Sequence, residues 1–120
     1  MYPMTFDVAK KICKYMDDKK ARDILMIDIE DRSVVADCFV IASGRSDQQV
    51  RSIADEVEDK MEADNSLTLL RKEGYREGRW IVLDYGDILV HIFHQEEREH
   101  YDLERLWADG ENVTRYVEGE

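Results

Sequence analysis

Three histidines are the residues of this chain best suited to holding a transition metal. His91, His94 and His100 lie close together in the sequence, and imidazole nitrogen is a common zinc ligand. The run around His91 is rich in β-branched and aromatic residues, which predicts a strand. Residues three apart in a strand point to opposite faces, so His91 and His94 do not converge on one ion without a bulge. Two ordinary sheet histidines and one exposed helical histidine are therefore favoured over a zinc site.

Asp84 and Asp87 form a second candidate site, a carboxylate pair for acid–base or metal-assisted chemistry. They flank a short polar break between two apolar runs, where they can approach each other. Asp is also a common turn residue, because its side chain accepts hydrogen bonds from nearby backbone amides. No partner base or nucleophile accompanies the pair, so a turn-forming role is favoured over catalysis.

Residues 43–47, Ser-Gly-Arg-Ser-Asp, are a candidate phosphate-binding turn. They link a predicted strand to the start of a predicted helix, where exposed backbone amides attract anions. The segment has one glycine and lacks the Lys-Ser/Thr ending of a P-loop. Asp47 would repel a phosphate at the same helix start. A plain turn is the better account, with Ser46 and Gln49 forming a capping box.

A fourth group of residues is suited to binding a protein. It consists of Trp80, Asp84, Tyr85, Asp87 and Tyr101. Trp and Tyr are frequent anchors of protein interfaces, and acidic neighbours suit a basic partner. Alternatively, Trp80 and Tyr85 merely cap the core, and composition leaves these two interpretations open.

The elements that position these residues are predicted from apolar periodicity. Residues 80–83 and 88–93 form the two strands of a tight hairpin, with Gly86 in the break between them. A hairpin cannot bury two nearly continuous apolar strands by itself, so further strands and helices must cover it. Strands are also predicted at residues 23–28, within residues 34–42 and at residues 67–70, and helices at residues 5–17, 47–63 and 96–107. This pattern indicates one α/β domain with helices packed on a sheet.

The charge balance indicates which partners suit the chain. Asp and Glu number 28 against 17 Lys and Arg, which gives a formal net charge of -11. Binding to a phosphate backbone needs clustered cations, so direct nucleic-acid binding is disfavoured. A basic protein partner is compatible with this charge, and long-range attraction would speed such an encounter. On charge alone, a role in solubility only is favoured.

The chain shows no sign of export or membrane insertion. No apolar run approaches the length of a membrane span, and the first residues lack the pattern of a secretory signal. Cys13 and Cys38 lie far apart and form no metal-binding pair. They are typical of small buried residues in a reducing compartment, so a cytoplasmic location is expected.

Four blocks of the sequence resemble a known family. They are residues 37–47 (DCFVIASGRSD), 52–57 (SIADEV), 80–93 (WIVLDYGDILVHIF) and 97–107 (EREHYDLERLW). In this order and spacing they resemble the signature blocks of the ribosomal silencing factor (Iojap) family. The resemblance implies a single α/β domain over residues 1–113, with a mixed five-stranded sheet and a shape like that of nucleotidyltransferases. Residues 114–120 are expected to be a loosely ordered tail.

The resemblance also implies a function. Such factors bind the large ribosomal subunit through large-subunit ribosomal protein number fourteen and obstruct joining of the small subunit, which represses translation when nutrients are scarce. Trp80, Asp84, Tyr85 and Asp87 match family-type positions and, with Tyr101, are the expected partner-binding residues. No membrane and no cofactor are expected, and the resemblance allows a homodimer when the protein is free of the ribosome.

The likeness to nucleotidyltransferases raises an enzyme as the alternative. Such enzymes resemble one another in a Gly-Ser turn at a helix start and in paired carboxylates on the next strand that hold Mg²⁺. The corresponding turn here is residues 44–46, but the next predicted strand, residues 67–70, carries no carboxylate. Nothing there can hold the metal that would neutralise a triphosphate. A binding protein without catalytic residues or a metal is therefore favoured.

Overall fold

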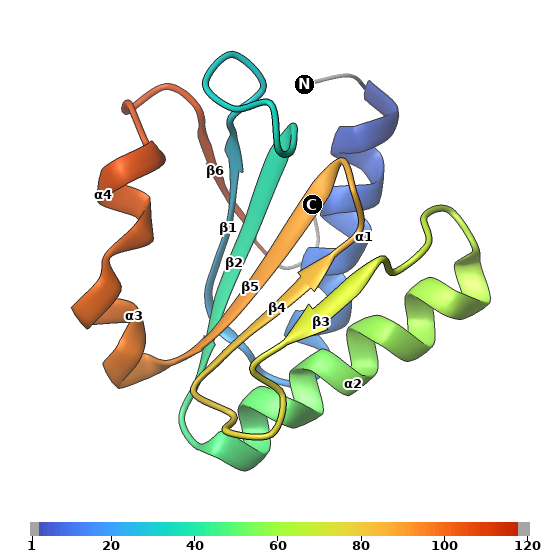
Figure 1. The fold of residues 1–120 in the computed structure, drawn as a ribbon, viewed down its shortest axis with the longest axis vertical. Coiled ribbons are helices and arrows are strands. Elements are labelled where there is room, and N and C mark those ends of the chain that lie inside the picture. The colour runs from blue at the N-terminus through green and yellow to red at the C-terminus, as the bar shows by residue number, and fades with distance from the viewer. Residues whose placement is uncertain (1–2, 118–120) are drawn as a thin grey trace.

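A six-stranded mixed sheet forms the centre of the molecule in the computed structural model, which describes residues 3–117 (Figure 1). The strands are β1 (Arg22–Asp28), β2 (Cys38–Gly44), β3 (Arg71–Glu73), β4 (Trp80–Asp84), β5 (Ile88–His94) and β6 (Val113–Arg115). Their order across the sheet is β3-β4-β5-β2-β1-β6. The central pair, β2 and β5, is parallel, and every other pair is antiparallel.

Alternating side chains divide the core between the two faces of the sheet. Because successive strand residues point to opposite sides, Val90 and Ile92 of β5 join one buried cluster and Phe93 joins another. In β2, Val40 joins the first cluster and Ile41 joins the second. All seven residues of β2 are buried, as expected for a strand that is covered on both sides.

Two long helices, α1 (Pro3–Asp17) and α2 (Asp47–Asp64), cover the first face. Apolar residues at helical spacing line their buried sides, including Val8, Ile12 and Met16 in α1 and Ile53, Val57 and Met61 in α2. Both helices agree with the sequence prediction to within about two residues. The Ser46 hydroxyl accepts a hydrogen bond from the Gln49 amide at 3.1 Å, as the capping box predicts. The Gln49 side chain instead accepts from the Arg45 amide at 2.6 Å.

Two short helices, α3 (Gln95–Tyr101) and α4 (Leu103–Trp107), lie on the opposite face (Figure 1). The prediction of one helix over residues 96–107 is wrong, because Asp102 adopts a left-handed conformation with φ 45°. Its amide bonds to the Arg98 carbonyl at 2.9 Å, which closes α3 before α4 begins.

The sheet differs from the predicted five strands at both edges. The strand predicted at residues 67–70 is wrong, because β3 begins at Arg71. Thr114 and Arg115, placed in the tail by prediction, pair in β6 with Met26 and Leu25 of β1. The sheet therefore extends past residue 113, and the rest of the predicted tail includes residues 118–120, which lie outside the described part. Within residues 3–117, no helix has the length and hydropathy needed to cross a bilayer.

Candidate protein-binding surface

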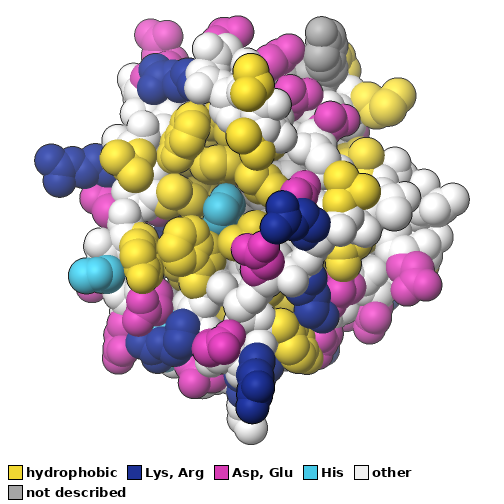
Figure 2. Space-filling model, viewed as in Figure 1, with side chains coloured by type: hydrophobic (Ala, Val, Ile, Leu, Met, Phe, Trp, Pro, Cys, Tyr) yellow, Lys and Arg dark blue, Asp and Glu magenta, His cyan; other side chains and the backbone are white. Residues whose placement is uncertain are grey.

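An apolar surface remains on the α3–α4 side of the sheet. These helices leave part of β4 and β5 open, and Trp80 and Val82 of β4 and Leu89 of β5 are only partly covered there. Figure 2 views the molecule from this side and shows hydrophobic side chains gathered around a histidine, with charged side chains surrounding them. We define the aromatic face as Phe39, Trp80, Leu89, His91, Tyr101 and Trp107.

Trp80 holds the aromatic face together while part of its ring stays exposed. Its ring stacks on Phe93 with centroids 4.8 Å apart and packs against Tyr101 at 4.7 Å. Its indole Nε1 donates a hydrogen bond to Nδ1 of His91 at 3.1 Å. The indole thus joins β4, β5 and α3, and its remaining exposed area is available to a partner.

His91 occupies the floor of the aromatic face. Only 6% of the residue is exposed, and the Phe39 ring meets it edge-on with centroids 4.7 Å apart. Burial lowers the pKa of His91 to about 4, because the imidazolium would lose its hydration. The ring is therefore neutral at physiological pH.

The side of the aromatic face formed by α3 and α4 carries exposed apolar groups. Tyr101, at the end of α3, is 47% exposed. Trp107, at the end of α4, packs edge-on against Phe39 with centroids 5.2 Å apart. Leu106 beside it is 72% exposed. Exposed aromatic and aliphatic side chains grouped in this way are typical of a protein-binding surface.

One end of the sheet is acidic. The backbone carbonyl of Asp87, in the turn between β4 and β5, accepts hydrogen bonds from the amides of Asp37 and Cys38 at 2.9 and 3.1 Å. This places Asp37 beside Asp87. Burial raises the pKa of the Asp37 carboxyl, and the negative charges of Asp87 and Glu30 raise it further. A basic partner would relieve this repulsion.

Arg79 lies beside the opposite end of β4 and is neutralised within the chain. Its guanidinium contacts Glu97 at 2.9 Å, Glu96 at 3.1 Å and Asp47 at 3.5 Å. Hydrogen bonds to Glu97 and Glu96 raise the pKa of Arg79. Arg79 therefore ties the start of β4 to the starts of α2 and α3, and it does not offset the acidic charge at the other end.

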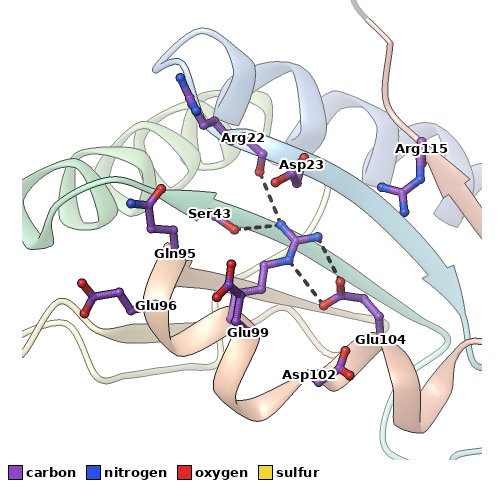
Figure 3. Close-up of a pocket in the computed structure, with 10 residues that line it drawn as sticks. Arg22, Asp23, Ser43, Gln95, Glu96, Glu99, Asp102, Glu104 and Arg115 are labelled. Atoms are coloured by element: carbon purple, nitrogen blue, oxygen red, sulfur yellow. Dashed lines mark hydrogen bonds and ion pairs between the residues drawn. The ribbon is translucent and has the colours of Figure 1, made fainter.

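A polar cavity of about 720 Å³ is lined by residues of α3, α4, β1 and β2, and Arg98 of α3 is one of them. In Figure 3, dashed lines join this guanidinium to the side chains of Ser43 and Glu104 and to the backbone carbonyl of Arg22. Arg98 donates to the Ser43 hydroxyl at 2.8 Å and the Arg22 carbonyl at 3.4 Å, and it contacts both carboxylate oxygens of Glu104 at 3.4 Å. Because these groups already engage the guanidinium, its evident role is to attach α3 and α4 to β1 and β2.

Comparison with known proteins identifies the family. The sequence model for the family described as "Ribosomal silencing factor during starvation" matches residues 3–119. The chain is 48% identical over 93 residues to the "Ribosomal silencing factor RsfS" of Bacillus subtilis, covering 78% of each chain. The chain belongs to the ribosomal silencing factor family.

Solved structures share the fold of this silencing factor. A crystal structure of a protein from Chromobacterium violaceum matches with a TM-score of 0.82 at 28% identity, covering 92% of this chain and 91% of that chain. A crystal structure from Bacillus halodurans matches with a TM-score of 0.73 at 36% identity, covering 88% of this chain and 95% of that chain.

The fold brings only some of the site residues predicted from the sequence together. Trp80 and Tyr101 are in contact on the aromatic face. Asp84 ends β4, and its carboxylate accepts a hydrogen bond from the Gly86 amide at 2.8 Å, so it holds the turn. The side chain of Asp87 is exposed in the same turn.

Tyr85 does not belong to this surface, which corrects its grouping with Trp80. It is 4% exposed and packs in the cluster that faces α1 and α2. Asp84 is four positions after Trp80, so the two side chains share a face of β4. Tyr85 is five positions after Trp80 and therefore points to the other side. Tyr85 instead lines a cavity of about 290 Å³ beside Glu58 of α2.

The sequence prediction of the binding surface missed four members of the aromatic face, which are Phe39, Leu89, His91 and Trp107. The pairing of the hairpin places His91 on the same side of the sheet as Trp80. Trp80 and Val82 are two residues apart in β4 and share a face, and their partners across the hairpin are Phe93 and His91. The sequence favours an ordinary sheet histidine over a metal ligand at His91, without assigning it to a binding surface. The described residues 3–117 contain no group of three or more His, Cys, Asp or Glu side chains placed to hold a metal.

Proposed function

We propose that this silencing factor binds the large ribosomal subunit through large-subunit ribosomal protein number fourteen, obstructs joining of the small subunit and represses translation in the cytoplasm. The observation that carries the proposal is the aromatic face, where a partly exposed Trp80 and an exposed Tyr101 surround a buried imidazole. Aromatic anchors in a well-packed setting typically supply most of the binding energy of an interface.

The charge of the chain supports a basic protein as the partner. The net charge is -11, and Asp37 and Asp87 place acidic groups at one end of the sheet. An acidic surface attracts a basic ribosomal protein and repels the phosphate backbone of ribosomal RNA. Joining of the subunits is blocked in this proposal because a protein seated on the joining surface occupies the space that the small subunit needs.

Co-sedimentation with separated ribosomal subunits tests the proposal. The protein is expected to pellet with large subunits and not with small subunits. In sucrose gradients, preincubation of large subunits with the protein should reduce the amount of joined ribosomes formed when small subunits are added. Equal binding to both subunits, or joining at the normal level with the large subunit saturated, would contradict the proposed function.

A further inference from the structure

His91 carries a hydrogen-bond donor that the described part of the chain leaves without a partner. The indole Nε1 of Trp80 only donates, so Nδ1 of His91 must accept at 3.1 Å. In a neutral imidazole the other nitrogen, Nε2, then carries the hydrogen. This Nε2 is buried and has no hydrogen-bond partner among the described residues.

Within residues 3–117, the elements around His91 offer no acceptor that satisfies this N–H. Across the sheet, His91 is paired with Val82 of β4 and with Ile41 of β2, both of which have purely aliphatic side chains. The rings of Phe39 and Phe93 lie at centroid distances of 4.7 and 6.2 Å. A buried donor without a partner is unfavourable and uncommon in folded proteins. Its position at the floor of the aromatic face points to an acceptor that arrives from outside the chain.

Resting on the function proposed above, we propose that docking of the partner protein moves aside the side chains that cover Nε2 of His91, and that Nε2–H then donates a hydrogen bond to a neutral carbonyl oxygen of the partner. The acceptor is a backbone carbonyl or the side-chain amide of Asn or Gln. A Lys or Arg side chain of the partner cannot be the acceptor, because ammonium and guanidinium groups only donate hydrogen bonds. A carboxylate is disfavoured as the acceptor, because the acidic residues at the end of the sheet would repel it. Basic residues of the partner therefore contact the acidic end of the sheet, and a neutral acceptor contacts the centre.

Two variants test the role of His91 against a matched control. His91→Phe keeps a flat ring and removes the Nε2–H, together with the Nδ1 acceptor of Trp80. Tyr85→Phe removes a different buried polar group, a hydroxyl on the opposite face that also lacks a partner among the described residues. Affinity for large ribosomal subunits should fall about tenfold in His91→Phe, because a buried partner carbonyl loses its donor. Tyr85→Phe should bind like wild type.

Nitrogen NMR of the unaltered protein provides a second measurement that does not depend on how a variant folds. The free protein should show His91 protonated at Nε2. On adding isolated large-subunit ribosomal protein number fourteen, the Nε2-bound proton should move downfield, as expected for a new hydrogen bond.

The outcomes separate this inference from the proposed function. If wild type does not bind large subunits, both are overturned. If wild type binds, and folded His91→Phe binds equally well or the Nε2 proton does not move, the inference alone is overturned and a water molecule satisfies the imidazole. If both variants lose binding equally, the loss reflects general destabilisation, and an unmoved Nε2 proton would then overturn the inference.

Discussion

Replacing Trp80 with alanine should weaken binding to the large ribosomal subunit by about thirtyfold or more and leave the protein folded. An aromatic anchor at the centre of a small interface typically contributes about 2 kcal/mol or more when truncated, which corresponds to about thirtyfold in affinity. The exposed part of the Trp80 ring is the part available to a partner. Its contact with Tyr101 also holds a second exposed aromatic ring in place.

The same substitution also costs stability, because much of Trp80 packs within the chain. Its ring stacks on Phe93 at 4.8 Å and its Nε1 donates to His91. A fully buried Trp typically loses about 3–5 kcal/mol on truncation, so about 2–3 kcal/mol is expected for this partly buried one. In a domain of this size that loss corresponds to a fall in melting temperature of about 10 °C.

The assay is paired, with thermal unfolding and co-sedimentation measured on the same samples well below the melting temperature. Val57→Ala is a suitable control, because Val57 is a fully buried residue of α2 that packs on the other side of the sheet. It should lose about 2 kcal/mol of stability and bind like wild type. If Trp80→Ala binds with wild-type affinity, or if Val57→Ala loses binding equally, the aromatic face is not the binding surface.

Four further predictions follow from particular contacts. The pKa of His91 is about 4 in the folded protein against 6.5 for an ordinary histidine, so the unfolded chain takes up the proton first as the pH falls. The stability that neutral, buried His91 provides is therefore complete above pH 6.5 and is lost as the pH falls towards 4. The unfolding free energy of wild type relative to His91→Phe, measured in urea, should fall by about 3 kcal/mol over that range, and a constant difference would contradict the assignment. Arg98→Ala should lower the unfolding free energy by about 2–3 kcal/mol, because it leaves Ser43 and Glu104 without their donor, whereas the exposed Arg105→Ala should change it little; equal losses would contradict the structural role. Raising the ionic strength should mainly slow association with isolated large-subunit protein number fourteen in surface plasmon resonance, and a salt-independent association rate would count against attraction by the acidic end. Incubation with labelled triphosphates and Mg²⁺ should show no turnover, and turnover that disappears when Asp84 and Asp87 are changed to Asn would favour an enzyme.

The parts of the fold that local pattern determines were predicted correctly. The α2 helix follows from apolar residues at spacings of three and four between a Ser46 cap and Asn65, which is left-handed with φ 57°. The strands β4 and β5 follow from β-branched runs separated by a turn that contains Gly86, which has φ 85°. In each case the residues that specify the element lie within it or next to it.

The parts that long-range contacts determine were missed. The β6 strand has three residues, of which two are exposed, and its place in the sheet comes from pairing with β1. The Tyr116 amide continues this pairing to the Ile24 carbonyl at 3.0 Å. Neither the hydropathy nor the β-propensity of such a short segment indicates a strand. The break at Asp102 is similar, because a left-handed residue other than glycine is uncommon and the sequence carries no glycine there.

The membership of the aromatic face was predicted only in part, because the candidate residues were grouped by type and nearness in sequence rather than by side of the sheet. In the hairpin, Ile81, Leu83, Val90 and Ile92 face the helices α1 and α2. Trp80, Leu89 and Phe93 face the other side. One stretch of sequence therefore provides both the core and the aromatic face. The position of a residue in the alternation of its own strand decides to which of the two it belongs.

This division explains why substitutions in one hairpin should separate into two classes. A change at Leu83 removes volume from a fully buried site, so it should act through stability and reduce binding only as the folded population falls. A change at Leu89, which is partly covered on the aromatic face, should reduce affinity with a smaller effect on stability. Leu83→Ala and Leu89→Ala remove the same atoms from adjacent strands, so a difference in affinity that remains after correction for the unfolded fraction reports the side of the sheet. If both variants lose affinity only in proportion to their unfolded fraction, neither side of the hairpin contacts the ribosome and the binding surface must lie elsewhere.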